Sequence, residues 1–74
     1  MKNVKVISQP AVMFGKPVIA GTRITVEHIL RCLAAGERPE DIVADYPPLT
    51  LHDIAAAQAF AADHLAGEAV FAAE

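Results

Sequence analysis

The chain has 74 residues, a formal net charge of −3 and a single cysteine. This length corresponds to one domain, residues 1–74, and one cysteine excludes both an internal disulfide and a multi-cysteine zinc site. The N-terminus does not resemble a signal peptide and no apolar stretch is long enough to span a bilayer. We therefore expect a cytoplasmic protein that makes no contact with a membrane.

The small size of the chain favours self-association. A chain this short buries only about 60% of its unfolded surface and is marginally stable as a monomer. Small domains compensate with disulfides, a metal or oligomerisation. The first two are not favoured here, so a homodimer is the expected state.

Charge is distributed unevenly along the chain. Residues 1–25 contain four cations and no acid, a balance of +4, whereas residues 26–74 contain two cations and nine acids, a balance of −7. Such asymmetry predicts two surfaces with different partners. The alternative is that the two parts attract each other, within one chain or across a subunit boundary.

An N-terminal β arm is predicted over residues 4–24. Its short strands are Val4–Ile7 and Val18–Ile19, with turns at Gly15–Pro17 and Gly21–Arg23. Two short strands are marginal alone, so they need a helix to pack on or a second copy to pair with.

Three helices are predicted after the arm, at about 26–35, 39–46 and 51–65, followed by a short tail at 66–74. Thr25 is a candidate N-cap of the first helix and Gly36 ends it. Pro39 suits the first turn of the second helix, and the segment from Thr50 to Asp53 resembles a capping box with Asp in place of Glu.

The third helix is rich in alanine and has an apolar seam of period 3.5. The seam comprises Leu51, Ile54, Gln58, Ala61 and Leu65, with Phe60 beside it. A core face is the favoured interpretation, and a dimer interface is the alternative.

No group of residues predicts catalysis. His28 and Cys32 lie four positions apart on the first helix, but two ligands do not make a zinc site, and Cys32 is better explained as a small buried side chain. The glycines of the arm are interpreted as turn formers rather than as a phosphate-binding loop. A phosphate would need a backbone N–H that Pro17 lacks. We expect no enzyme activity, cofactor, metal or small-molecule substrate.

Two sets of residues are candidates for macromolecular binding. Basic arm residues could contact operator DNA, namely Lys2, Lys5, Lys16 and Arg23. The third helix has two acids and no Lys or Arg, so phosphates would repel it. Acidic helical residues or the apolar tail could contact a protein partner, namely Glu40, Asp41, Asp45, Asp53, Val70 and Phe71.

The sequence resembles the bacterial family called domain of unknown function 433 over roughly residues 7–62. The resemblance is carried by the ungapped segments Phe14–Val26, Ile29–Leu30, Leu33–Gly36, Pro39–Ile42, Asp45–Pro47, Leu49–Thr50 and Asp53–Ile54. It implies a homeodomain-like, helix-turn-helix-like three-helix core with an N-terminal β arm, usually dimeric. It also implies an antitoxin of a type II toxin–antitoxin module, encoded beside a PIN-like ribonuclease. The double proline created by Pro48 departs from the family pattern.

Three functions remain open at this point. The first is an antitoxin-like protein that binds and neutralises a PIN-like ribonuclease and also regulates its own operon. The second is a free-standing transcriptional regulator that binds DNA through the basic arm. The third is a purely structural dimerisation module.

Overall fold

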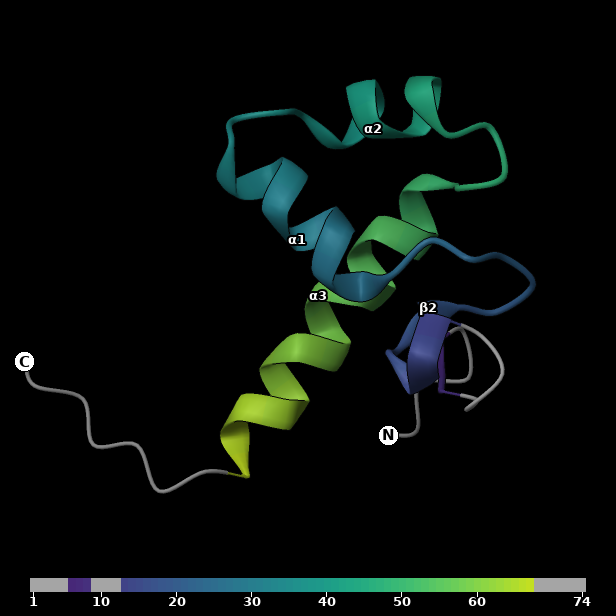
Figure 1. Ribbon diagram of the computed structural model, residues 1–74. Helices are drawn as coiled ribbons and strands as arrows, with labels where there is room; N and C mark the ends of the chain where they lie inside the picture. The colour runs from purple at the N-terminus through teal and green to yellow at the C-terminus, as the bar shows by residue number, and fades with distance from the viewer. Residues whose placement is uncertain (1–5, 9–12, 68–74) are drawn as a thin grey trace, which may run out of the picture.

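The computed structural model describes residues 6–8 and 13–67, in which three helices form a core that carries a small β arm (Figure 1). The elements are β1 (Val6–Ile7), the 3-10 turn η1 (Met13–Gly15), β2 (Val18–Ile19), α1 (Val26–Ala34), α2 (Pro39–Asp45) and α3 (Leu51–Ala66). In Figure 1, α1 crosses α3, α2 lies above both, and the arm lies beside α3. The predicted fold class, mainly α with an N-terminal β arm, is confirmed.

The two strands of the arm pair with each other in antiparallel register within one chain. Val6 is opposite Ile19, and Ile7 is opposite Val18. The first strand was predicted from residue 4, and its first two residues lie outside the described ones. A turn after β2 is closed by Thr22, whose backbone N donates to the Ile19 carbonyl at 3.0 Å. The short arm persists because Val6 and Ile19 are buried in the same core as the helices.

The ends of α1 follow the predicted signals. The Thr25 hydroxyl accepts a hydrogen bond from a first-turn backbone N–H at 2.9 Å. At the other end, Gly36 has a φ of 95°. Its N–H donates to the Leu33 carbonyl at 3.0 Å, and the Glu37 N–H donates to the Cys32 carbonyl at 3.1 Å. This is the Schellman arrangement, in which glycine is favoured because it adopts positive φ without a steric penalty.

The starts of α2 and α3 also match the prediction. Pro39 occupies the first turn of α2, where its missing N–H costs nothing. At α3, the Thr50 hydroxyl accepts from the Asp53 backbone N at 3.1 Å, and Asp53 Oδ2 accepts from the Thr50 backbone N at 3.0 Å. The predicted capping box with Asp in place of Glu is therefore present.

The core joins all three helices to the arm. Ile29 of α1, Ile42 of α2 and Ile54 of α3 are each at most 1% exposed. Ile19 of the arm and Leu49 of the α2–α3 connection complete the largest buried side chains around them. None of the helices in the described part of the chain is both long and apolar enough to cross a bilayer.

The predicted core seam of α3 is only partly correct. Ile54 is buried, but Leu51 and Leu65 are 55% and 56% exposed. The buried residues of α3 lie between positions 53 and 57. A helix of 16 residues extends about 24 Å, which is longer than the core it covers. Phe60 still packs against the core, and the last turns of the helix extend past it, as Figure 1 shows.

Candidate interaction surfaces

The predicted basic surface of the arm is weaker than its sequence suggests. Lys2 and Lys5 lie outside the described residues. Lys16 Nζ lies 3.0 Å from Glu27 Oε1 on α1, so its charge is offset locally. Arg23 is exposed in the connection between β2 and α1. Among the described residues of the arm, Arg23 is therefore the only cation without an ion pair.

Glu27 of α1 pairs with two cations, Lys16 of the arm and Arg31 one turn further along α1. Its Oε1 accepts from Lys16, and its Oε2 accepts from Arg31 Nε at 3.2 Å and Nη2 at 3.1 Å. The hydrogen bond from Lys16, followed by that from Arg31, holds the pKa of Glu27 below its ordinary value of 4.5. All three side chains are largely solvated, so salt screens these pairs.

The Glu27 ion pairs should make the stability of the arm depend on pH. Because the folded-state pKa of Glu27 is lowered, its contribution is complete above the unfolded pKa and is lost as pH falls through the folded value. We expect Glu27→Gln to flatten the loss of thermal stability below pH 4.5. Thermal melts of both proteins at pH 7 and through the acid range would measure this. A parallel loss in the two proteins would contradict the role of Glu27.

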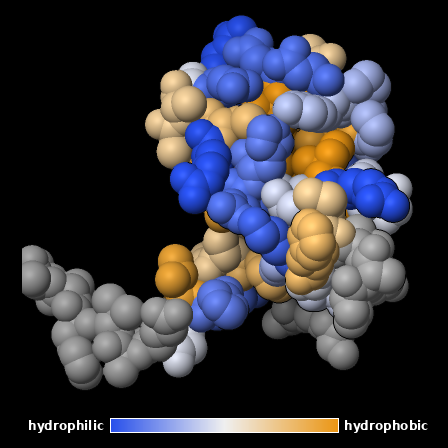
Figure 2. Space-filling view, viewed as in Figure 1, coloured by the Kyte–Doolittle hydropathy of each residue, from blue (hydrophilic) through white to orange (hydrophobic). Residues whose placement is uncertain are grey.

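An acidic surface lies on α2 and its preceding loop. Glu37, Glu40, Asp41 and Asp45 are all exposed, and we call these four residues the α2 acidic surface. Asp41 forms an ion pair with Arg38, with Arg38 Nε 3.1 Å from Asp41 Oδ2. The Arg38 hydrogen bond lowers the pKa of the Asp41 carboxyl. Figure 2 shows hydrophilic surface gathered at the top of the molecule, over α2.

Asp53, predicted as part of the partner-binding face, does not belong to this surface. It is 3% exposed, because its carboxylate turns back onto the start of α3 as the capping partner of Thr50. Its role is structural. Val70 and Phe71, the apolar candidates for partner binding, lie outside the described residues.

Cys32 is buried, as predicted, and its thiol lies beside the ring of His28. Cys32 Sγ lies 3.6 Å from His28 Nε2, which is also 2.8 Å from the hydroxyl oxygen of Tyr46 at the end of α2. Burial of Cys32, and secondarily the nearby Glu37 carboxylate, raises the pKa of the thiol. A raised pKa disfavours the reactive thiolate, and the contacts of His28 with Cys32 and Tyr46 join α1 to α2. In the described part of the chain, no three His, Cys, Asp or Glu side chains are grouped to hold a metal ion.

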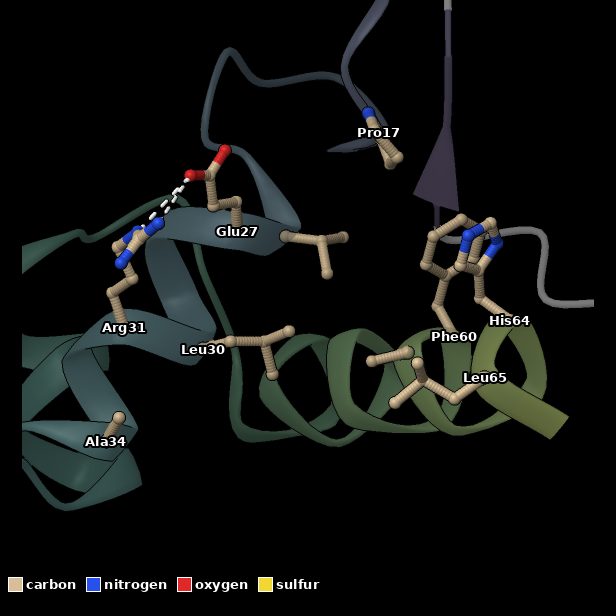
Figure 3. Close-up of a pocket in the computed structure, with 10 residues that line it drawn as sticks. Pro17, Glu27, Leu30, Arg31, Ala34, Phe60, His64 and Leu65 are labelled. Carbon is tan, nitrogen blue, oxygen red and sulfur yellow. Dashed lines mark hydrogen bonds and ion pairs between the residues drawn. The ribbon is translucent and has the colours of Figure 1, made fainter. Parts of the chain in front are cut away.

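An apolar groove of about 500 Å³ lies between α1 and the C-terminal half of α3. Figure 3 shows Leu30 of α1 facing Phe60 and Leu65 of α3, with Pro17 of the arm at one end. The Glu27–Arg31 ion pair lies on the α1 side, and the rings of Phe60 and His64 are stacked with centroids 6.2 Å apart. The remaining lining residues are Val26, Ala34 and Ala61.

The sequence does not predict this groove, although the apolar face of α3 is a partial signal of it. The predicted seam of α3 contains Ala61 and Leu65, and Phe60 lies beside it. A core face and a dimer interface are the two explanations of that seam. Leu65 is more than half exposed, so this end of the seam borders open apolar surface rather than core. We refer to it as the α1–α3 groove.

The exposure of Phe14 is a second feature that the sequence does not predict. Its side chain is 95% exposed, and its backbone has a φ of 59° and a ψ of 31°. Met13 before it also has positive φ, at 48°. Left-handed backbone in residues other than glycine costs about 1–3 kcal/mol each and gathers at functional positions. The neighbouring Gly15, whose φ is 82°, adopts such a conformation freely.

Comparison with known proteins agrees with the resemblance seen in the sequence. A family model described as "Protein of unknown function (DUF433)" matches residues 6–61, a range that contains the arm, α1, α2 and most of α3. The fold is similar to the crystal structure of a DUF433 member protein from Anabaena variabilis ATCC 29413, with a TM-score of 0.76 and 29% sequence identity. The similarity covers 80% of this chain and 58% of that chain, so this chain spans under two thirds of its neighbour's length. No curated protein matches.

Proposed function

Because the chain belongs to the DUF433 family, which is described only as one of unknown function, we propose from its own surfaces that it is an antitoxin-like binding protein. In this proposal it belongs to a type II toxin–antitoxin module and neutralises a PIN-like ribonuclease by direct binding. The observation that carries the proposal is the exposed α2 acidic surface. The class of nuclease comes from the sequence resemblance.

Charge complementarity supports a nuclease as the partner. A ribonuclease must hold a polyanionic backbone, and it does so with cations lining its substrate cleft. The segment from Glu37 to Asp45 carries four acids and one arginine, a balance of −3, and its acids are exposed. An anionic protein surface of this kind is attracted to such a cleft and competes there with RNA.

The charge of α3 supports a protein rather than a nucleic acid at the helical core. In a helix-turn-helix arrangement the last helix reads the major groove. Here α3 carries Asp53 and Asp63 and has no Lys or Arg. Phosphates on either side of the groove would meet no cation from this helix. The helical core is therefore assigned to protein recognition.

Co-expression with a PIN-like ribonuclease encoded beside this gene tests the proposal. We expect one complex on size exclusion and loss of ribonuclease activity. Glu40→Lys combined with Asp45→Lys should weaken binding about tenfold or more at low salt, with a smaller difference at high salt. Asp41 is kept in this variant because it pairs with Arg38.

Asp63→Lys is the matched control, since it reverses an exposed acid on α3 outside the α2 acidic surface. It should leave the affinity unchanged. Separate elution of the two wild-type proteins at micromolar concentration would overturn the antitoxin assignment. Equal losses for the control and for the double variant would overturn the assignment of the surface.

Autoregulation through the arm is a second candidate function, favoured by the exposed side chain of Arg23. In that case binding to operator DNA weakens as salt is raised, and Arg23→Ala lowers the slope of that dependence by about one. An unchanged slope would remove the arm as the DNA surface. A purely structural dimerisation module would show neither nuclease binding nor operator binding.

A further inference from the structure

We propose that the α1–α3 groove is the docking site for Phe14 of a second copy of this chain, and that the exchange is reciprocal. Each subunit then supplies one aromatic side chain and one groove, and two copies form a closed homodimer. This inference does not depend on the proposed function, because it uses neither the α2 acidic surface nor a nuclease.

Phe14 has the properties of an anchor that is buried on association. Its ring is 95% exposed, whereas aromatic side chains near the centre of an interface are among the largest contributors to binding. Hydrogen bonds to the residues on either side of Phe14 hold the η1 backbone. The Lys16 backbone N donates to the Met13 carbonyl at 3.1 Å, and the Ser8 hydroxyl donates to the Gly15 carbonyl. The left-handed backbone thus holds the ring away from its own chain.

The groove has the chemistry to receive such a ring. Its walls are side chains of Leu30, Ala34, Ala61 and Leu65 from two helices, and Phe60 supplies an aromatic face (Figure 3). The alanines leave room between the larger side chains. Seven of the ten lining residues are apolar, and the charged or polar ones are the Glu27–Arg31 pair and His64. Docking of an uncharged ring therefore leaves the ion pair at the edge in place.

The occupant is a second copy because one chain carries both halves of the contact. Pro17 lines the groove and lies three residues after Phe14 in the same arm, so the anchor and the end of the groove are neighbours in the chain. At 95% exposure, Phe14 does not occupy the groove of its own chain. Two such surfaces related by a two-fold axis satisfy each other, and the arrangement closes at two subunits.

Stability supports the same occupant. A domain of 74 residues is near the lower limit of independent folding, and oligomerisation is a common way to support it. The last turns of α3 extend beyond the core (Figure 1), and Figure 2 shows apolar surface on them. Short helical segments are unstable in water without tertiary packing. A second arm laid along α1 and α3 provides that packing.

Light scattering coupled to size exclusion tests the dimer. For a subunit of 7.8 kDa, the wild-type chain should elute with twice that mass at micromolar concentration. Phe14→Ser should weaken dimerisation about a hundredfold or more, because two rings lose their burial, and circular dichroism should show unchanged helix content. Leu51→Ser is the matched control: Leu51 is 55% exposed but lies outside the groove, so this variant should remain dimeric.

A mixing experiment tests reciprocity. Leu65→Glu places a charge in the groove at a position that is 56% exposed, so the fold should persist and the variant should be monomeric. A Phe14→Ser chain keeps an intact groove, and a Leu65→Glu chain keeps an intact Phe14. Mixed and labelled with a fluorescent donor and acceptor, the two should form heterodimers at concentrations where neither associates alone.

Three results would overturn the proposal. A wild-type chain that is monomeric on the order of 100 μM excludes the dimer. A dimer that survives Phe14→Ser unchanged excludes Phe14 as its anchor. If the mixed variants do not associate, Phe14 and the groove are not two sides of one contact, and the proposal is overturned. This holds whatever the outcome of the nuclease experiment.

Discussion

Ile29→Ala is expected to leave little folded protein at 25 °C. Ile29 is fully buried in α1, where it joins the cluster that contains Ile42 of α2 and Ile54 of α3. Removing a buried isoleucine side chain costs about 2–5 kcal/mol, because transfer energy and packing are both lost. A core of this size rarely supplies more than about 3–5 kcal/mol in total. The substitution therefore removes most or all of the stability.

Urea denaturation followed by circular dichroism would measure this effect, at one fixed protein concentration because the proposed dimerisation would contribute to stability. Ile29→Val should give a folded protein that is less stable by about 0.5–1.5 kcal/mol, which would lower the melting temperature by about 4–8 °C per kcal/mol. Leu51→Ala, at a site 55% exposed, should be nearly neutral. Equal effects at Ile29 and Leu51 would contradict the described core.

Local signals in the sequence were sufficient to predict the helices. Thr25, Pro39 and Thr50 each act at a helix start as their chemistry requires, and Gly36 ends α1 in a backbone conformation that glycine favours. These features depend on residues within one helical turn of each other. They can therefore be read from the chain without knowing how the helices pack.

Packing partners could not be read in the same way. The apolar seam of α3 shows which face is hydrophobic, but the place where α1 crosses that face decides which part is covered. Ile54 is buried in the core, whereas Leu65 is exposed at the border of the α1–α3 groove. The groove and the exposed Phe14 both follow from this three-dimensional arrangement. Neither leaves a periodic pattern in the sequence.

The charge counted along the chain also overstates the positive charge of the arm surface. The arm carries a positive balance in the sequence, but Lys16 is engaged by Glu27 from the helical part. An acid that the sequence assigns to the negative half thus offsets a cation of the positive half. The sequence left this attraction within one chain open as an alternative, but it could not name the partners, because ion pairs form between residues that are close in space.

Asp53→Ala is the second substitution with a large expected effect, and it separates structure from recognition. The change removes the carboxylate that accepts from the Thr50 backbone N at 3.0 Å, and with it one half of the capping box. We expect a loss of about 1–2 kcal/mol, since the capping interaction that is lost is made by a buried carboxylate. Thermal or urea denaturation measures the change.

The partner of this pair provides the control for Asp53. Thr50→Ala should cost a similar amount, and the double variant should cost less than the two single losses added together, because both substitutions break the same reciprocal box. Asp63→Ala, at an exposed position of the same helix, should change stability little. Below the unfolding temperature, Asp53→Ala should still bind the proposed nuclease partner with wild-type affinity, since the Asp53 carboxylate lies inside the fold. A weaker complex from a fully folded Asp53→Ala protein would return this residue to the recognition surface.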